Sequence, residues 1–119
     1  MKLNELPSFL EIEVQESLEE RFMESEALYV RFLKKLLNDT NVVELKQAVD
    51  AADWETAFRK AHNLKGVCAN LGLTKLSRCF AAIVAELRGG AYTAQSVGAL
   101  LDESLSEWEK TISCISKLE

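Results

Sequence analysis

The sequence is poor in the residues on which disulfide frameworks and metal centres depend. Its 119 residues include one proline, one histidine, five glycines and three cysteines. The cysteines form no Cys-x-x-Cys pair, so neither a disulfide framework nor a zinc knuckle is supported, and we expect reduced thiols. A single histidine excludes His-Glu-x-x-His zinc motifs and the repeated Glu-x-x-His motif of di-iron bundles. We therefore expect no metal site, and any histidine chemistry must use His62.

Basic residues and long apolar runs are also too few for two classes of partner. The chain has 14 Lys and Arg against 19 Asp and Glu, a net charge of -5, whereas phosphate contacts need clustered cations. The longest apolar run, Phe80 to Ala85, is far shorter than the ~20 residues of a membrane span. The acidic N-terminal stretch does not resemble a signal peptide. We expect a cytoplasmic protein that binds neither nucleic acid nor membrane.

The apolar residues that are present predict one helical domain. Hydrophobic residues make up 48% of the chain. This is enough for a single core over residues 1–119 that needs no disulfide bond or metal ion to stabilise it. They recur at spacings of three and four, while alternating strand patterns are scarce, so the fold class is all-α. Short connections between long amphipathic helices favour antiparallel neighbours. The sequence therefore predicts an up-down antiparallel four-helix bundle with a short extra N-terminal helix.

Cap and stop signals divide the chain into expected helices over residues 14–23, 25–37, 41–52, 54–71, 74–88 and 93–117. Side chains that can cap a helix N-terminus precede or open most of them; these are Ser8 with Glu11, Ser25, Asn41 with Glu44, Asp53 and Thr93. Gly72 and the pair Gly89-Gly90 stand where a left-handed residue ends a helix. In the 25–37 helix the residues expected to face inward are Leu28, Phe32, Leu33, Leu36 and Leu37.

The expected helix over residues 54–71 presents its histidine to solvent. At about 100° per residue, its core side lies opposite His62; that side carries Ala57, Ala61, Leu64, Cys68 and Leu71. The residues within about 60° of His62 are mostly polar or small; they are Glu55, Phe58, Arg59, Lys65, Gly66 and Ala69. We therefore expect an imidazole that projects from the bundle rather than into it.

Two neighbours of His62 suit phosphoryl transfer. Gly66 lies one turn along the same face, where glycine costs about 1 kcal/mol relative to alanine, and its missing side chain leaves room for another molecule. Lys65, three residues after His62, is close enough to place its ammonium near a phosphoryl group on the imidazole. In phosphoryl transfer, catalysis depends mainly on stabilising the negative charge that is spread over the phosphoryl oxygens.

The segment Ala61 to Gly72, with the sequence AHNLKGVCANLG, resembles the signature of bacterial histidine-containing phosphotransfer (HPt) domains. Its order of His, Leu two residues later, Lys, Gly and a closing Leu-Gly is that of the family. The resemblance extends to the preceding segments Arg21-Phe22, Leu28-Tyr29 and Lys34-Lys35. Val67-Cys68 departs mildly, because many members carry Ser or Ala there.

The resemblance implies a phosphorelay intermediate in two-component signalling, which is not an enzyme and has no kinase activity. His62 would accept a phosphoryl group from a receiver-domain aspartyl phosphate and pass it to another receiver aspartate. Lys65 would stabilise its charge and Gly66 would clear the approach. The expected docking residues are Phe58, Arg59 and Ala69.

The implied partners are response-regulator receiver domains and a hybrid histidine kinase. The chain itself is expected to be a monomer. This chain needs no cofactor, since Mg²⁺ is expected on the receiver. Two alternatives stay open. One is a histidine-kinase dimerisation domain, although Asn63 follows His62 and no proline follows Pro7. The other is a non-catalytic helical adaptor with an incidental histidine.

Overall fold

The computed structural model describes residues 1–119 and contains only helices, joined by short connections. In chain order they are the 3-10 helix η1 (Leu3–Ser8), α1 (Val14–Glu20), α2 (Glu26–Lys35), the 3-10 turn η2 (Leu36–Asn38), α3 (Asn41–Asp50), α4 (Trp54–Asn70), α5 (Thr74–Gly89) and α6 (Ala94–Ser116). The predicted all-α class is confirmed.

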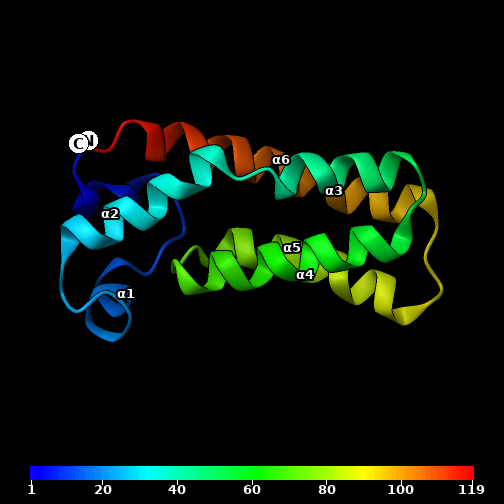
Figure 1. The fold of residues 1–119 in the computed structure, drawn as a ribbon, viewed down its shortest axis with the longest axis horizontal. Helices are drawn as coiled ribbons and strands as arrows, with labels where there is room; N and C mark the ends of the chain where they lie inside the picture. The colour runs from blue at the N-terminus through cyan, green and yellow to red at the C-terminus, as the bar shows by residue number, and fades with distance from the viewer.

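The helices form an elongated bundle of 42 × 24 × 21 Å. Figure 1 shows α2 and α3 following one another along one edge, α6 running beside them, and α4 and α5 forming an antiparallel hairpin. α4 packs against α3 and α5, and α6 packs against α5 and α3. If α2 and α3 are counted as one interrupted helix, this is the predicted four-helix bundle, with α1 as the short extra N-terminal helix.

Three of the predicted N-caps are confirmed by hydrogen bonds. Ser25 Oγ accepts from the backbone N–H of Leu28 at 3.1 Å, and Asp53 Oδ1 accepts from that of Thr56 at 3.2 Å. Thr93 Oγ1 accepts from the N–H of Ser96 at 3.0 Å, within a capping box. Each bond satisfies a backbone donor that has no partner inside the helix.

The cap predicted at Asn41 is wrong by one residue. Thr40 occupies the cap position and Asn41 is the first helical residue. The N–H of Asn41 instead donates to Asp39 Oδ1 at 2.7 Å, and Thr40 Oγ1 donates to Glu44 Oε1 at 3.1 Å. Thr40 thus holds the cap position without a side-chain bond to the helix backbone, and Asp39 accepts from the first helical N–H.

The N-terminal prediction needs two corrections. Ser8 and Glu11 form no capping box, because Ser8 is the last residue of η1, a helix that contains Pro7. The helix expected over residues 14–23 ends at Glu20. Met23 and Glu24 then adopt left-handed backbones with φ of 52° and 58°, a conformation that a continuing right-handed helix excludes.

The inward face of α2 is also turned relative to the prediction. Tyr29 and Leu33 are completely buried, whereas Phe32 is 36% exposed and Leu37 39% exposed. Tyr29 can be buried because its hydroxyl donates to the Leu71 carbonyl at 2.5 Å, which satisfies its one polar group. Burying Tyr29 leaves Phe32 at the edge of the core, where its ring lies 4.2 Å from Lys35 Nζ.

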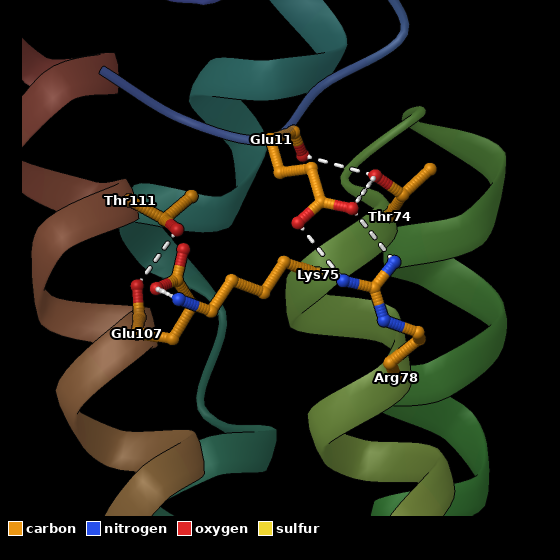
Figure 2. Close-up of polar contacts among 6 residues, drawn as sticks. All are labelled: Glu11, Thr74, Lys75, Arg78, Glu107 and Thr111. Carbon is orange, nitrogen blue, oxygen red and sulfur yellow. Dashed lines mark hydrogen bonds and ion pairs between the residues drawn. The ribbon is translucent and has the colours of Figure 1, made fainter.

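The N-terminal segment crosses the turn between α4 and α5. The N–H of Glu13 donates to the Gly72 carbonyl at 2.9 Å, and the Glu11 carboxylate forms two bonds with the Arg78 guanidinium of α5, at 2.7 and 2.9 Å (Figure 2). Gly72 has the predicted left-handed φ of 74°, and a Cβ there would lie 2.9 Å from the Glu13 carbonyl oxygen. Glycine is thus required both by the turn and by the chain that crosses it.

Candidate functional site

α4 presents its single histidine to solvent and its small apolar residues to the core. His62 is exposed, while Ala57, Ala61, Leu64 and Cys68 are all completely buried. The predicted division of α4 into a core side and a histidine side is confirmed. The core side belongs to one cluster of 28 buried residues, so the helix that carries His62 is held in place by the packed hydrophobic core.

Two interactions fix the ends of the helix that carries His62. At the N-terminus, hydrogen bonds from Thr56 hold the pKa of Asp53 below its ordinary value of 3.8. Asp53 therefore stays ionised near neutral pH, which suits the partial positive charge of a helix N-terminus. At the C-terminus the chain turns at Gly72 under the crossing N-terminal segment. His62 lies between these two fixed ends.

The ring of Phe58, one turn before His62, lies against the imidazole. The two ring centroids are 6.2 Å apart and the planes differ by 25°. Phe58 is half-buried and also packs against the core. The predicted docking residue is therefore in contact with the histidine itself, and little of its ring is free to meet a partner. Arg59 is exposed and takes part in no salt bridge.

Lys65 and Gly66 occupy the turn after His62. Lys65 is half-buried, and no carboxylate lies within salt-bridge distance of its ammonium. A Cβ added at Gly66 would meet nothing within 4 Å, so the space above this glycine is open. Ala69, one turn further along, is exposed. The chain thus keeps a cation and free volume beside the imidazole.

A residue that sequence reasoning did not select also reaches this face. Arg88, in the last turn of α5, places its guanidinium carbon 5.4 Å from the centroid of the Phe58 ring. It is exposed and forms no salt bridge. The sequence showed Arg88 only as part of a helix stop, because nothing in its local pattern indicates which residue of α4 it faces.

Cysteine and metal chemistry find no support at the site. Burial raises the pKa of the Cys68 thiol to about 12, which keeps it protonated and a poor nucleophile. Burial also raises the pKa of Cys79, on α5. No group of three or more His, Cys, Asp or Glu side chains is arranged to hold a metal ion.

An apolar groove of about 540 Å³ lies beside the C-terminal half of α4, between α1, α2 and α4. Its lining residues are Arg21, Phe22, Leu28, Phe32, Lys35, Leu36, Asp39, Val67, Asn70 and Leu71. Val67 and Asn70 come from the helix that carries His62, but they lie about 80° to 140° around it from the histidine. The groove is therefore separate from the face that carries Lys65 and Arg88.

Comparison with known proteins identifies the family. A family model that describes the Hpt domain matches residues 28–111, which run from α2 into α6 and include His62. The chain belongs to the Hpt domain family. No curated protein and no solved structure gives a match.

Membership of the Hpt family places the chain in two-component phosphorelay signalling. Hpt domains carry phosphoryl groups on histidine and are in general not enzymes. They interact with receiver domains and histidine kinases. None of the helices of this chain combines the length and the apolar character needed to cross a membrane.

Proposed function

We propose that His62 is the phosphoacceptor of this Hpt domain and relays phosphoryl groups between receiver aspartates. One observation carries the proposal: the only histidine of the chain lies in the matched region and is exposed on a helix whose opposite side is core. An Hpt domain needs a histidine that a partner can reach, and no other residue here meets that requirement.

In the proposed step the lone pair of the unprotonated imidazole nitrogen attacks the phosphorus of a receiver aspartyl phosphate. The N–P bond forms as the O–P bond breaks, and that electron pair stays on the aspartate carboxylate. The proton on the other ring nitrogen is lost to solvent afterwards. The reverse sequence delivers the phosphoryl group to a second receiver. No net oxidation or hydrolysis takes place, so the chain acts as a carrier without kinase activity.

Lys65 and Gly66 have distinct roles in this step. The ammonium of Lys65 is free of carboxylate partners, so it can offset the negative charge that spreads over the phosphoryl oxygens. The open space over Gly66 lets the receiver bring its aspartate close to the imidazole. This chain would need no metal of its own, since Mg²⁺ held by the receiver would offset further phosphoryl charge from the partner's side.

The receiver docks around His62, with Arg59 and Ala69 exposed on either side of the histidine. Phe58 contributes less contact area than its position in the sequence suggested, because it is half-buried. The whole chain acts as one cytoplasmic module and as a monomer. Its single buried cluster of hydrophobic residues supports the proposal of one module.

The test uses isolated response-regulator receiver domains charged with ³²P-labelled acetyl phosphate. The wild-type chain should acquire acid-labile, base-stable phosphate from at least one of them, and His62→Gln should acquire none. The matched control is Asn63→Gln, which changes the neighbouring exposed residue and leaves the nucleophile in place. Both variants should melt near the wild-type temperature, because exposed side chains contribute little to stability.

Three outcomes would contradict the proposal in different ways. Phosphate uptake by His62→Gln would show that another residue is the acceptor. A folded wild-type chain that takes no phosphate from any receiver would favour the helical adaptor instead. A dimer by light scattering would favour a histidine-kinase dimerisation domain.

A further inference from the structure

A second helix contributes to the surroundings of His62. α5 runs antiparallel to α4 (Figure 1), and its last turn brings Arg88 over the Phe58 ring, whose other neighbour is the His62 imidazole. Arg88, Phe58 and His62 are therefore linked by two successive contacts, of 5.4 Å from the guanidinium carbon and 6.2 Å between ring centroids. Lys65 lies one turn beyond His62, so cations stand on both sides of the imidazole along the helix axis.

The guanidinium of Arg88 has no competing partner. Arg88 forms no salt bridge, whereas four other Lys and Arg side chains do; these are Lys46, Lys60, Lys75 and Arg78. The acidic residues nearest in sequence and on the histidine face, Glu86 and Glu55, do not pair with it. Its resolved contact is with the face of Phe58, an attraction that orients a guanidinium without neutralising it.

A phosphorylated imidazole would supply the partner that Arg88 lacks. Phosphoryl oxygens carry nearly two negative charges at neutral pH, and a guanidinium binds them with two parallel hydrogen bonds that an ammonium cannot form. To bind a group on His62, the side chain of Arg88 would turn away from the Phe58 ring by a change of rotamer.

We propose that Arg88 is a second cation of the phosphohistidine site, held next to His62 by Phe58, and that it binds the phosphoryl group once the group is on the imidazole. The inference rests on the proposed function of His62. Arg88 changes no covalent bond and moves no proton. Phe58 is a positioning residue that acts through Arg88, whose guanidinium carbon lies 5.4 Å from its ring centroid.

The experiment compares Arg88→Gln and Arg88→Lys with Lys110→Gln, a control on α6 that removes the same charge from an exposed, unpaired lysine. Each protein is mixed with a receiver domain charged by acetyl phosphate, and both the transfer rate and the equilibrium share of phosphate on the Hpt chain are measured. Arg88→Gln should lower that share roughly five- to tenfold. Arg88→Lys should recover part of it, and Lys110→Gln should match wild type.

The role of Phe58 is tested by Phe58→Leu, alone and combined with Arg88→Gln. If Phe58 acts through Arg88, the double variant should transfer no more slowly than the slower single variant, because the two changes remove one shared interaction. Melting temperatures identify any loss that comes from unfolding, and circular dichroism checks helicity. Independent, multiplicative losses would overturn the positioning role of Phe58.

The outcomes also separate this inference from the proposed function. If wild type carries phosphate on His62 and Arg88→Gln behaves like Lys110→Gln, the second cation is refuted while the phosphoacceptor stands. If His62→Gln still accepts phosphate, the phosphoacceptor is wrong and this inference fails with it. A folded Arg88→Gln with a lowered share, partly restored in Arg88→Lys, supports the inference.

Discussion

The hydroxyl of Ser77 on α5 donates a hydrogen bond of 3.0 Å to the backbone carbonyl of Lys65 on α4. Lys65 is one turn after His62 and directly precedes Gly66, the residue at which α4 is intrinsically weakest. The bond crosses between the two helices of the hairpin at this point. It connects the helix that carries the histidine to its neighbour where no side chain at Gly66 can do so.

Ser77→Ala should therefore destabilise the protein by about 1 kcal/mol, the usual net worth of one half-buried hydrogen bond. The control is Ser106→Ala on α6, an exposed serine that donates no hydrogen bond, because it makes the same gain in helix propensity. Urea unfolding followed by circular dichroism gives both free energies. Equal stability of the two variants would contradict the role given to Ser77.

Substitutions at Gly66 should separate stability from transfer. Gly66→Ala and Gly66→Gln both remove the glycine penalty, and nothing lies within 4 Å of an added Cβ. Thermal unfolding should show a gain of about 0.5–1 kcal/mol in each. Receiver-dependent phosphorylation should fall with side-chain size, so that Gln is slower than Ala, because the added group fills the approach to His62.

A more stable Gly66→Gln variant that transfers at the wild-type rate would refute the clearance role. A strongly destabilised variant would show instead that this face of α4 packs against something in solution. Melting temperature and phosphorylation rate measured on the same three proteins decide between these results.

Acid should loosen the N-terminal segment through Glu11. The hydrogen bonds from Arg78 hold the pKa of Glu11 below its ordinary value of 4.5, so the pair stabilises the fold at neutral pH and this contribution is lost as the pH falls through the lowered pKa. Unfolding free energy should decline as the pH falls below about 5. The decline should be less steep in Glu11→Gln than in Glu109→Gln, a control on α6 without an ion pair. If the unfolding free energy falls with pH at the same slope in both variants, the Glu11–Arg78 pair does not stabilise the fold.

Tyr29→Phe should cost stability that its burial alone does not predict. The variant keeps the ring and its stack on Phe22, with centroids 4.6 Å apart, but leaves the Leu71 carbonyl without the 2.5 Å bond from the hydroxyl. The expected loss is about 1–2 kcal/mol in denaturant unfolding. Tyr92→Phe, at a half-exposed tyrosine whose hydroxyl forms no hydrogen bond, should lie close to wild type.

Sequence reasoning succeeded where the deciding interaction is local. The caps at Ser25, Asp53 and Thr93 bond to the N–H three residues later, and the turn at Gly72 depends on a backbone angle that glycine favours. The orientation of His62 follows from helical periodicity alone. These features could be read from the chain because each depends on neighbours within one or two turns.

Sequence reasoning failed where the deciding partner is distant in the chain. Tyr29 is drawn inward by a carbonyl 42 positions later, and this displaces Phe32 from the place that its hydrophobicity predicted. Arg88 could not be assigned to the site without knowing that α5 returns past Phe58. The role of Glu11 as the partner of Arg78 likewise depends on how the N-terminal segment crosses the hairpin.

The residues proposed to handle the phosphoryl group all belong to the α4–α5 hairpin, which spans Trp54–Gly89 with a turn of only a few residues between its helices. Closing so short a loop costs little chain entropy, and contacts of low sequence separation form quickly. The contacts among His62, Phe58 and Arg88 thus need neither terminus of the chain for their topology. If these two helices were grafted onto a different protein scaffold, the graft would contain every residue of the proposed site. These are His62 as the nucleophile, Phe58 as the ring, and Lys65 and Arg88 as the cations.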